Sequence, residues 1–209
     1  MNHKSVLLIG LLLTIFACST VPKPRQLQEQ LLSVHIASWK NLRIDGVAEI
    51  NYKGFALRKN IVIRKNEEAL RADLFDSGIF GMSPAPFAGV YFGDELWVTL
   101  PGKKSPEQFT TDNTEKLSTI SEMIFNTEKL YERKDDIISG YKTEFENTVI
   151  TFNENFQIEK IELADKNYYA LFTYEEHLSE ITFWSNNQKA AEIIVDKINF
   201  EKQEVNKFK

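Results

Sequence analysis

The chain has 209 residues, a formal net charge of -5 at pH 7, 43% hydrophobic residues and a single cysteine. This length suits one domain with a sizeable hydrophobic core. A mildly acidic protein gains no electrostatic attraction from nucleic acid or from an anionic lipid surface, so the composition argues against a nucleic-acid-binding function.

The N-terminal segment has the features of a secretory signal. One positive charge in residues 1–4 precedes an uninterrupted apolar run of 13 residues, Ser5 to Ala17, which is too short to span a bilayer as a mature helix. The sequence IFAC at residues 15–18 then resembles a bacterial lipobox. We therefore predict a lipoprotein signal peptide over residues 1–17 and acylation of Cys18, with palmitate as a typical group. The alternatives are an ordinary secretory signal followed by a chance cysteine, or an N-terminal anchor helix.

Acylation of Cys18 would fix the protein to a membrane, because each buried methylene group contributes roughly 0.8 kcal/mol and several chains hold effectively permanently. Ser19 resembles the pattern of Gram-negative lipoproteins that are sent to the outer membrane. We therefore expect a lipid-anchored domain that faces the periplasm. Residues 18–25 contain two prolines and predict a short tether. With Cys18 acylated, no thiol remains for a disulfide.

Residues 26–209 predict one domain that is mainly β with two helical segments. Gln26 to Asn41 has the pattern of an amphipathic helix that packs on a sheet, with Leu27, Leu31 and Val34 on one side and apolar residues adjacent to them. The apolar period then changes to two residues, which is typical of strands. The predicted strands of the first half are Leu42–Ile50, Phe55–Lys65, Ala69–Asp76, Phe87–Phe92 and Glu95–Leu100. Short turns between them predict an antiparallel meander.

The second half repeats this organisation after a loop that contains glycine and proline. Thr110 to Lys134 has a helical pattern, and strand patterns follow it. The predicted strands are Tyr141–Phe152, Phe156–Leu163, Tyr168–Glu175, Ser179–Trp184 and Ala191–Lys202. A single sheet of roughly ten strands would curl, and one of its faces would wrap the two helical segments.

Residues with catalytic or metal-binding chemistry are sparse. Beyond the signal, the only histidines are His35, expected to pack beside the apolar residues of the first helix, and His177, expected in a turn. Neither has a metal-binding or catalytic spacing. The adjacent acids at 67–68, 135–136 and 175–176 are expected on turns that face solvent, rather than as a glycosidase pair. We predict no enzymatic activity, no cofactor and no metal site; an enzyme whose acids converge only in the folded chain is the alternative.

Apolar side chains on the strands are abundant, and alternation places them on one face. Such a face either forms a filled core or, in a curled sheet with only two helices to fill it, leaves a cavity able to hold acyl chains. The candidate cavity-lining residues are Trp39, Phe55, Leu57, Leu70, Leu74, Phe92, Leu96, Val98, Phe172 and Phe183.

The order of elements resembles the LolA/LolB superfamily of lipoprotein carriers and receptors, over about Leu27 to Phe208. The resembling segments are Trp39 with RIDG at 43–46, Ala69–Asp76 followed by SGIFG at 77–81, and the closing strand at 193–200. The resemblance implies an unclosed antiparallel β-barrel covered by helices. The acylated start is similar to that of the LolB-like receptors of the outer membrane, rather than to that of the soluble LolA carriers.

In LolB-like receptors, the loop after the third strand carries a protruding apolar side chain that assists insertion of incoming lipoproteins into the membrane. Here the candidate residues for such a loop are Ile79, Phe80, Met82 and Phe87, which lie among glycines and prolines. The resemblance implies Ile79 or Phe80 as the inserting residue. Because this loop is longer and richer in proline, a plug over the cavity mouth or a partner-docking site are the alternatives.

The resemblance implies a protein that binds acyl chains of lipids or lipoproteins in a hydrophobic cavity and aids lipoprotein localisation or insertion. Its partners would be membrane lipid through Cys18 and, in addition, lipoproteins or a periplasmic carrier. The alternative is a non-enzymatic interaction or sensor protein of the cell envelope that uses the same fold with a filled core.

Overall fold

The computed structural model describes residues 23–52, 54–76, 86–103, 105–108, 127–145, 148–163 and 167–208. The predicted signal peptide, Cys18 and three of the four loop candidates, Ile79, Phe80 and Met82, lie outside the described residues, as does most of the predicted helix Thr110–Lys134.

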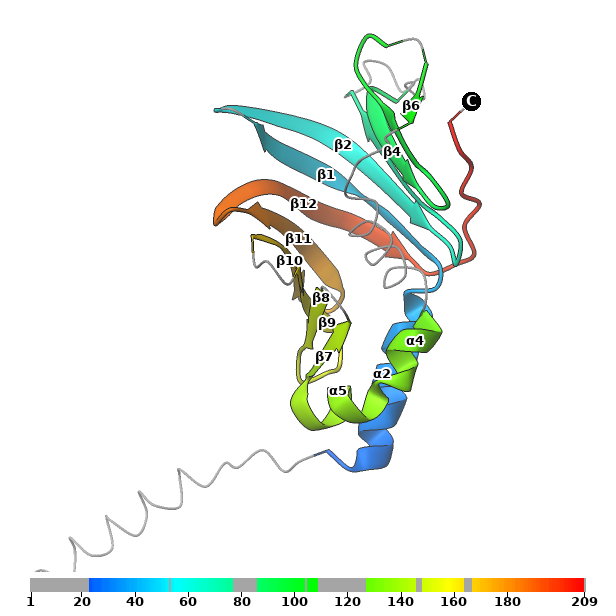
Figure 1. Cartoon of the computed structure of the whole chain (residues 1–209), viewed down its shortest axis with the longest axis vertical. Coiled ribbons are helices and arrows are strands. Elements are labelled where there is room, and N and C mark those ends of the chain that lie inside the picture. The colour runs from blue at the N-terminus through cyan, green and yellow to red at the C-terminus, as the bar shows by residue number, and fades with distance from the viewer. Residues whose placement is uncertain are drawn as a thin grey trace, which may run out of the picture.

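Twelve described strands form one antiparallel sheet (Figure 1). They are β1 (Leu42–Tyr52), β2 (Phe55–Lys65), β3 (Leu70–Phe75), β4 (Ala88–Phe92), β5 (Leu96–Thr99), β6 (Glu107–Gln108), β7 (Lys142–Phe145), β8 (Thr148–Phe152), β9 (Ile158–Leu163), β10 (Tyr168–Tyr174), β11 (Leu178–Ser185) and β12 (Gln188–Asn199). The described helices are α2 (Arg25–Ser38), α4 (Thr127–Glu132) and α5 (Lys134–Gly140).

The strand order is β6-β5-β4-β3-β2-β1-β12-β11-β10-β9-β8-β7. Each half of the sheet is therefore a meander of consecutive hairpins, and the pairing of β1 with β12 is the seam that joins the halves. The described strands form an open sheet, because β6 and β7 stand at its two ends. This confirms the predicted mainly β, antiparallel and unclosed architecture, whereas coverage of the opening by helices stays a prediction.

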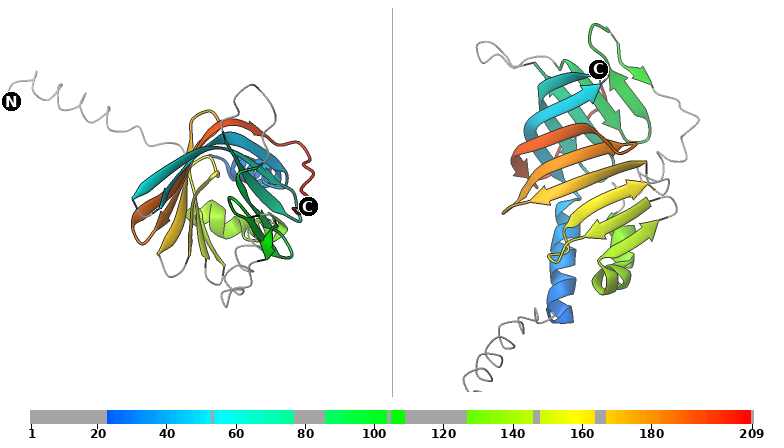
Figure 2. Two further views of the ribbon diagram at one scale, coloured as in Figure 1. Left: turned by 90° about the horizontal axis from the view of Figure 1, so that it is seen from above. Right: turned by 90° about the vertical axis from the view of Figure 1, so that its left-hand side faces the viewer.

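The sheet is strongly curved, and the helices lie on its concave side (Figure 2). Leu32 and Ile36 of α2 and Ile137 of α5 are buried, and they pack in one hydrophobic cluster with concave-face residues of the strands. Their apolar side chains remove this part of the sheet from water, which is the main stabilising contribution to the fold.

Lys65 joins the end of α2 to the sheet. Its side chain is buried, and its ammonium donates hydrogen bonds to the carbonyl oxygens of Trp39 (2.5 Å), Lys40 (3.4 Å) and Asn66 (3.3 Å). Burial lowers the pKa of Lys65 to about 8, and the nearby charge of Glu67 partly opposes this shift. The ammonium thus satisfies carbonyls at the C-terminal end of α2, which helix geometry leaves without partners.

Three predictions of secondary structure were wrong. The predicted single strand Tyr141–Phe152 is two paired strands, β7 and β8. A short strand, β6, was not predicted. The predicted helix at 110–134 has a break in its described part, since α4 ends at Glu132 and α5 begins at Lys134, so the acids at 135–136 lie in the first turn of a helix and not in a loop.

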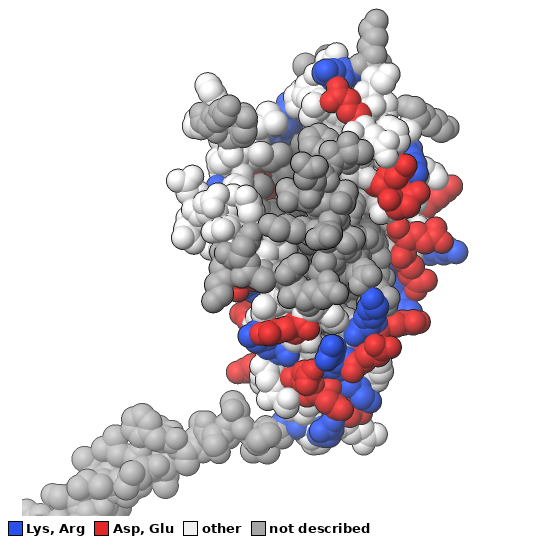
Figure 3. All heavy atoms as spheres, viewed as in Figure 1, with Lys and Arg blue, Asp and Glu red and all other residues white. Residues whose placement is uncertain are grey.

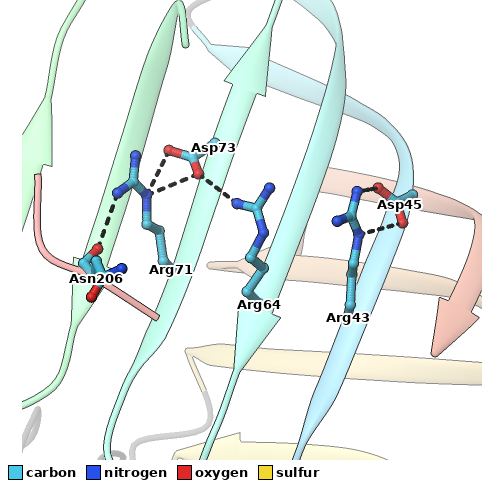
Figure 4. Close-up of polar contacts among 6 residues, drawn as sticks. All are labelled: Arg43, Asp45, Arg64, Arg71, Asp73 and Asn206. Atoms are coloured by element: carbon cyan, nitrogen blue, oxygen red, sulfur yellow. Dashed lines mark hydrogen bonds and ion pairs between the residues drawn. The ribbon is translucent and has the colours of Figure 1, made fainter. Parts of the chain in front are cut away.

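The convex face carries charged pairs and the C-terminal segment (Figure 4). Asp73 on β3 accepts hydrogen bonds from Arg71 Nε (2.9 Å) and Arg64 Nη1 (3.2 Å). Arg71 Nη1 also donates to the carbonyl oxygen of Asn206 (3.0 Å), and the Arg71 guanidinium lies 4.4 Å from the centroid of the Phe208 ring. The last residues of the chain therefore lie against the convex side of β3.

Candidate functional site

One row of apolar side chains crosses the concave face over six strands. Side chains on one face of a sheet alternate along each strand, so the register of the pairs fixes which residues are neighbours across it. The row runs through Leu57 (β2), Ile50 (β1), Ala191 (β12), Phe183 (β11), Ala170 (β10) and Ile161 (β9). We call the first five of these residues the open row.

The next row toward the helices is filled by the protein itself. It consists of Ala48, Ile193, Ile181 and Phe172, all of which are buried and belong to the cluster that contains Leu32 and Ile36. By contrast, Leu57 and Phe183 of the open row have relative exposures of 37% and 38%. The concave face is therefore filled on the side of the helices and retains an accessible apolar strip toward the β1–β2 and β11–β12 turns.

The strip continues to the end of the β1–β2 hairpin. Phe55 has the same orientation in β2 as Leu57, two residues further on, and its exposure is 79%. Tyr168, which lies on the concave face of β10 two residues before Ala170, is also exposed. Neighbouring exposed aromatic and aliphatic side chains on one concave face are typical of a surface that binds an apolar partner.

A second apolar feature is a groove of about 380 Å³ beside α2. This volume falls in the range of small-molecule sites. The groove lies between α2, the β8–β9 turn, the β10–β11 turn and the end of β12. Its lining residues are Leu31, Val34, His35, Ser38, Trp39, Asn155, Gln157, Tyr174, Glu176, His177, Leu178, Ile198 and Phe200.

His35 is a half-buried member of the groove wall. Its Nε2 accepts a hydrogen bond from the backbone N–H of Ile158 (3.0 Å), and its ring meets the edges of Trp39 and Tyr174 with centroid distances of 5.9 and 6.3 Å. Burial lowers the pKa of His35 to about 4. A neutral ring that accepts at Nε2 carries its proton on Nδ1. His35 therefore ties α2 to β9 as a neutral side chain.

Acid is expected to weaken the folded state through His35. Between pH 6.5 and about 4, the unfolded chain binds a proton at this histidine and the folded chain does not, so stability falls as the pH falls. The full effect is about 3 kcal/mol, since one pKa unit corresponds to about 1.4 kcal/mol. Urea unfolding of wild type and of the His35→Gln variant across this range measures it, and the variant should lose a smaller part of its stability.

His177→Gln is the matched control, because His177 is exposed on the facing β10–β11 turn. This variant should keep the wild-type dependence of unfolding free energy on pH. Equal dependence in wild type and His35→Gln would contradict the role assigned to His35.

The structure distributes the ten predicted lining residues among different environments. Trp39 lines the groove, and Phe172 is buried in the core. Leu57 and Phe183 belong to the open row, with Phe55 beyond it. The remaining five are partly buried on the concave side of β3, β4 and β5: Leu70, Leu74, Phe92, Leu96 and Val98.

Phe87 is the one loop candidate within the described residues. Its backbone N–H donates to the carbonyl oxygen of Leu74 (2.7 Å), and the Lys59 ammonium lies 4.5 Å from its ring centroid. Phe87 thus begins the return from the loop to β4, next to the last residues of β3.

The sequence analysis did not name several residues of the open row and of the groove beside α2 as candidates. Ile50, Ala170 and Ala191 of the open row lie on predicted strands, and the period of two already placed them on an apolar face. Ile198 in β12 and Phe200 just after it lie on a predicted strand, but nothing local predicted that they line a groove with α2, because that contact depends on the seam.

Within the described ranges, no three His, Cys, Asp or Glu residues come together in a way that would hold a metal ion. In the same ranges, no helix has the length and apolar character needed to span a bilayer.

Comparisons with known proteins give structural likenesses only. No family model matches the sequence, and no curated protein matches it. Among solved structures, the chain is similar to a LolA superfamily protein from Nitrosomonas europaea, with 9% identity, a TM-score of 0.47, and coverage of 86% of this chain and 94% of that one.

Two further solved structures are similar. One is a domain described as an outer membrane lipoprotein-sorting protein from Vibrio parahaemolyticus, with 9% identity, a TM-score of 0.45, and coverage of 82% of this chain and 91% of that one. The other is a DUF1329 family protein from Desulfovibrio piger, with 8% identity, a TM-score of 0.44, and coverage of 82% and 90%. At these identities and TM-scores the likenesses concern overall fold alone, and the function has to be argued from the chain's own residues.

Proposed function

We propose that this chain is a lipid-anchored, non-enzymatic protein of the cell envelope that binds acyl chains on the open part of its concave face. Lipoproteins, delivered directly or by a periplasmic carrier, are the proposed cargo, and aid to their localisation or insertion at the outer membrane is the proposed role. The anchor is the acylated Cys18.

The open row carries this proposal. Five strands contribute apolar side chains to it in register, and Leu57 and Phe183 remain more than a third exposed beside a row that is buried. Water next to such a surface is released when hydrocarbon covers it, and each methylene group that leaves water contributes roughly 0.8 kcal/mol. Affinity is therefore expected to rise with the length of the acyl chain.

Filling of the concave face beside the helices limits where a chain can lie. Ile181 and Ile193 are covered by the protein's own side chains, so an acyl chain has to lie across the strands along the open row and toward Phe55. Such binding needs neither a metal nor a nucleophile, and transfer of the chain follows from differences in burial between donor, protein and membrane.

A charge placed in the open row is expected to abolish most of the binding. Leu57→Asp and Phe183→Asp should each weaken binding of a fluorescent fatty acid at least tenfold, because hydrocarbon would then cover an unpaired carboxylate. Titration of delipidated protein with the probe measures this effect.

Ala56→Asp is the matched control, since Ala56 is exposed in β2 and faces the convex side. It should bind the probe as wild type does. The proposal fails if wild type shows no saturable binding, or if all three variants bind equally; a stable protein partner on the same surface would instead point to the interaction or sensor alternative.

A further inference from the structure

Helix α2 has two apolar stripes, of which one is buried. Leu32 and Ile36 face the core of the domain. Leu27, Leu31 and Val34 recur at steps of four and three residues and form a second stripe on another side of the helix. The sequence pattern led us to expect this second stripe to pack on the sheet, and the structure corrects that expectation for Val34, whose exposure is 64%.

The second stripe continues into the groove beside α2, and its middle residue, Leu31, is partly buried against the core. Leu31, Val34 and Phe200 line the same groove, and Phe200 has an exposure of 47%. Leu27, one turn closer to the start of the helix than Leu31, is exposed as well. The N-terminal half of α2, which contains Leu27 and Leu31, projects past the strands (Figure 2), so this part of the apolar surface lies at one end of the molecule. We call Leu27, Leu31, Val34 and Phe200 the α2 patch.

The α2 patch lies close to the start of the described chain. The Lys23 ammonium donates hydrogen bonds to the Glu154 carbonyl oxygen (3.0 Å) and to Asn155 Oδ1 (2.9 Å), both in the β8–β9 turn. Asn155 also lines the groove. Cys18 precedes Lys23 by only five residues, and five extended residues span at most about 18 Å. An acyl anchor on Cys18 therefore holds this end of the domain near the bilayer surface.

We propose that the α2 patch is a docking surface for the bilayer that holds Cys18. The inference rests on the proposed acylation of Cys18 and is independent of the proposed binding of acyl chains to the open row. Docking would bury Val34 and Phe200 at the boundary between headgroups and acyl chains, where exposed apolar side chains of surface helices lie.

Charge makes little contribution to this contact. Basic and acidic side chains are intermixed over the end of the molecule that carries the helices (Figure 3). The Lys23 ammonium is engaged with the β8–β9 turn. Among the described residues, the groove lining contains one carboxylate, Glu176, and no lysine or arginine. The anchor raises the effective concentration of the patch at the membrane, so a few apolar side chains suffice for docking. The contact should therefore be insensitive to salt and to the fraction of anionic lipid.

Single spin labels on the full acylated protein in phosphatidylcholine vesicles test this proposal. Cys18 is the only cysteine, and acylation occupies its thiol, so an introduced cysteine is the only labelling site. Val34→Cys and Phe200→Cys report on the α2 patch. Ser33→Cys is the matched control, because Ser33 is exposed on the same helix, one residue away and on another side.

Labels at 34 and 200 are expected to show a severalfold higher ratio of oxygen to nickel-chelate accessibility than the label at 33, at low and at high salt. Equal, water-like ratios at 33, 34 and 200 in protein that floats with the vesicles would overturn the docking. Failure to float would overturn the acylation and the docking with it, while binding of the fatty-acid probe to the open row is measured without vesicles. Adding Leu27→Asp to the Phe200→Cys variant should lower the ratio at 200 without preventing flotation.

Discussion

Gly46→Ala is expected to prevent stable folding or to lower the free energy of unfolding by about 4 kcal/mol or more. Gly46 lies in β1 at the irregularity where the register between β1 and β12 shifts. A Cβ there would fall far inside van der Waals distance of the Ile194 carbonyl oxygen and would also crowd the Cα of Val195. These obstacles are backbone atoms, which move only if the two strands separate.

Urea unfolding monitored by circular dichroism measures the effect. Gly140→Ala in α5 is the control, because a Cβ at Gly140 meets no atom within 4 Å. Alanine is favourable in a helix, so this variant should be neutral or slightly stabilised. Wild-type stability of Gly46→Ala would mean that β1 and β12 do not approach as closely as the structure has them.

Asp73→Ala is expected to lower the free energy of unfolding by about 3 kcal/mol, because removing one partner of a buried ion pair leaves the others without compensation. The Asp73 side chain is only 2% exposed, and it accepts from both Arg64 and Arg71 (Figure 4). The loss should extend to the C-terminal segment, since Arg71 also holds Asn206 and contacts Phe208. Hydrogen exchange at residues 203–208 should therefore increase together with the loss of stability.

Asp45→Ala is the comparison, because Arg43 and Asp45 form the same kind of pair within one strand as Arg71 and Asp73, at a more exposed position. Asp45 pairs with Arg43, two residues earlier on the same face of β1, and the two side chains are 31% and 39% exposed. Exposed pairs contribute at most about 1 kcal/mol. Equal effects of the two substitutions would contradict the assignment of Asp73 as the buried centre of the cluster.

The strands could be predicted from the sequence where one face of the strand is buried and the other is exposed to solvent. The predicted strand Phe55–Lys65 coincides with β2, in which alternate residues from Ile61 to Lys65 are buried. The alternation also located β10 and β11 to within one residue at each end. A period of two is a local property, so a single sequence contains it.

The errors arose where local patterns do not mark a boundary. The alternation runs from β7 to β8 without a strong turn signal at residues 146–147, so two strands were predicted as one. The break between α4 and α5 falls at Arg133, a residue with good helix propensity. Tertiary contacts set these boundaries, and their partners are distant in the sequence.

The sequence predicted which residues of each strand lie on the apolar face, but not which of these side chains are exposed in the folded protein. Alternation selected Leu57 and Phe172 alike, yet one is exposed and the other is buried beside Trp39, with 5.6 Å between the ring centroids. That difference depends on how far the helices extend over the concave face. Similarly, the sequence placed Leu27, Leu31 and Val34 on one side of α2 with apolar residues adjacent to them, whereas the identity of the buried pair, Leu32 and Ile36, required the folded structure.

The position of the seam has a consequence for how the chain folds as it is made. β1 is the first of the described strands, and one of its two neighbours, β12, comprises residues 188–199, close to the end of the given sequence. Until those residues have been synthesised, the long edge of β1 has unpaired backbone groups and can pair with foreign strands. We therefore expect truncations before residue 188 to aggregate rather than to accumulate as a half-sheet.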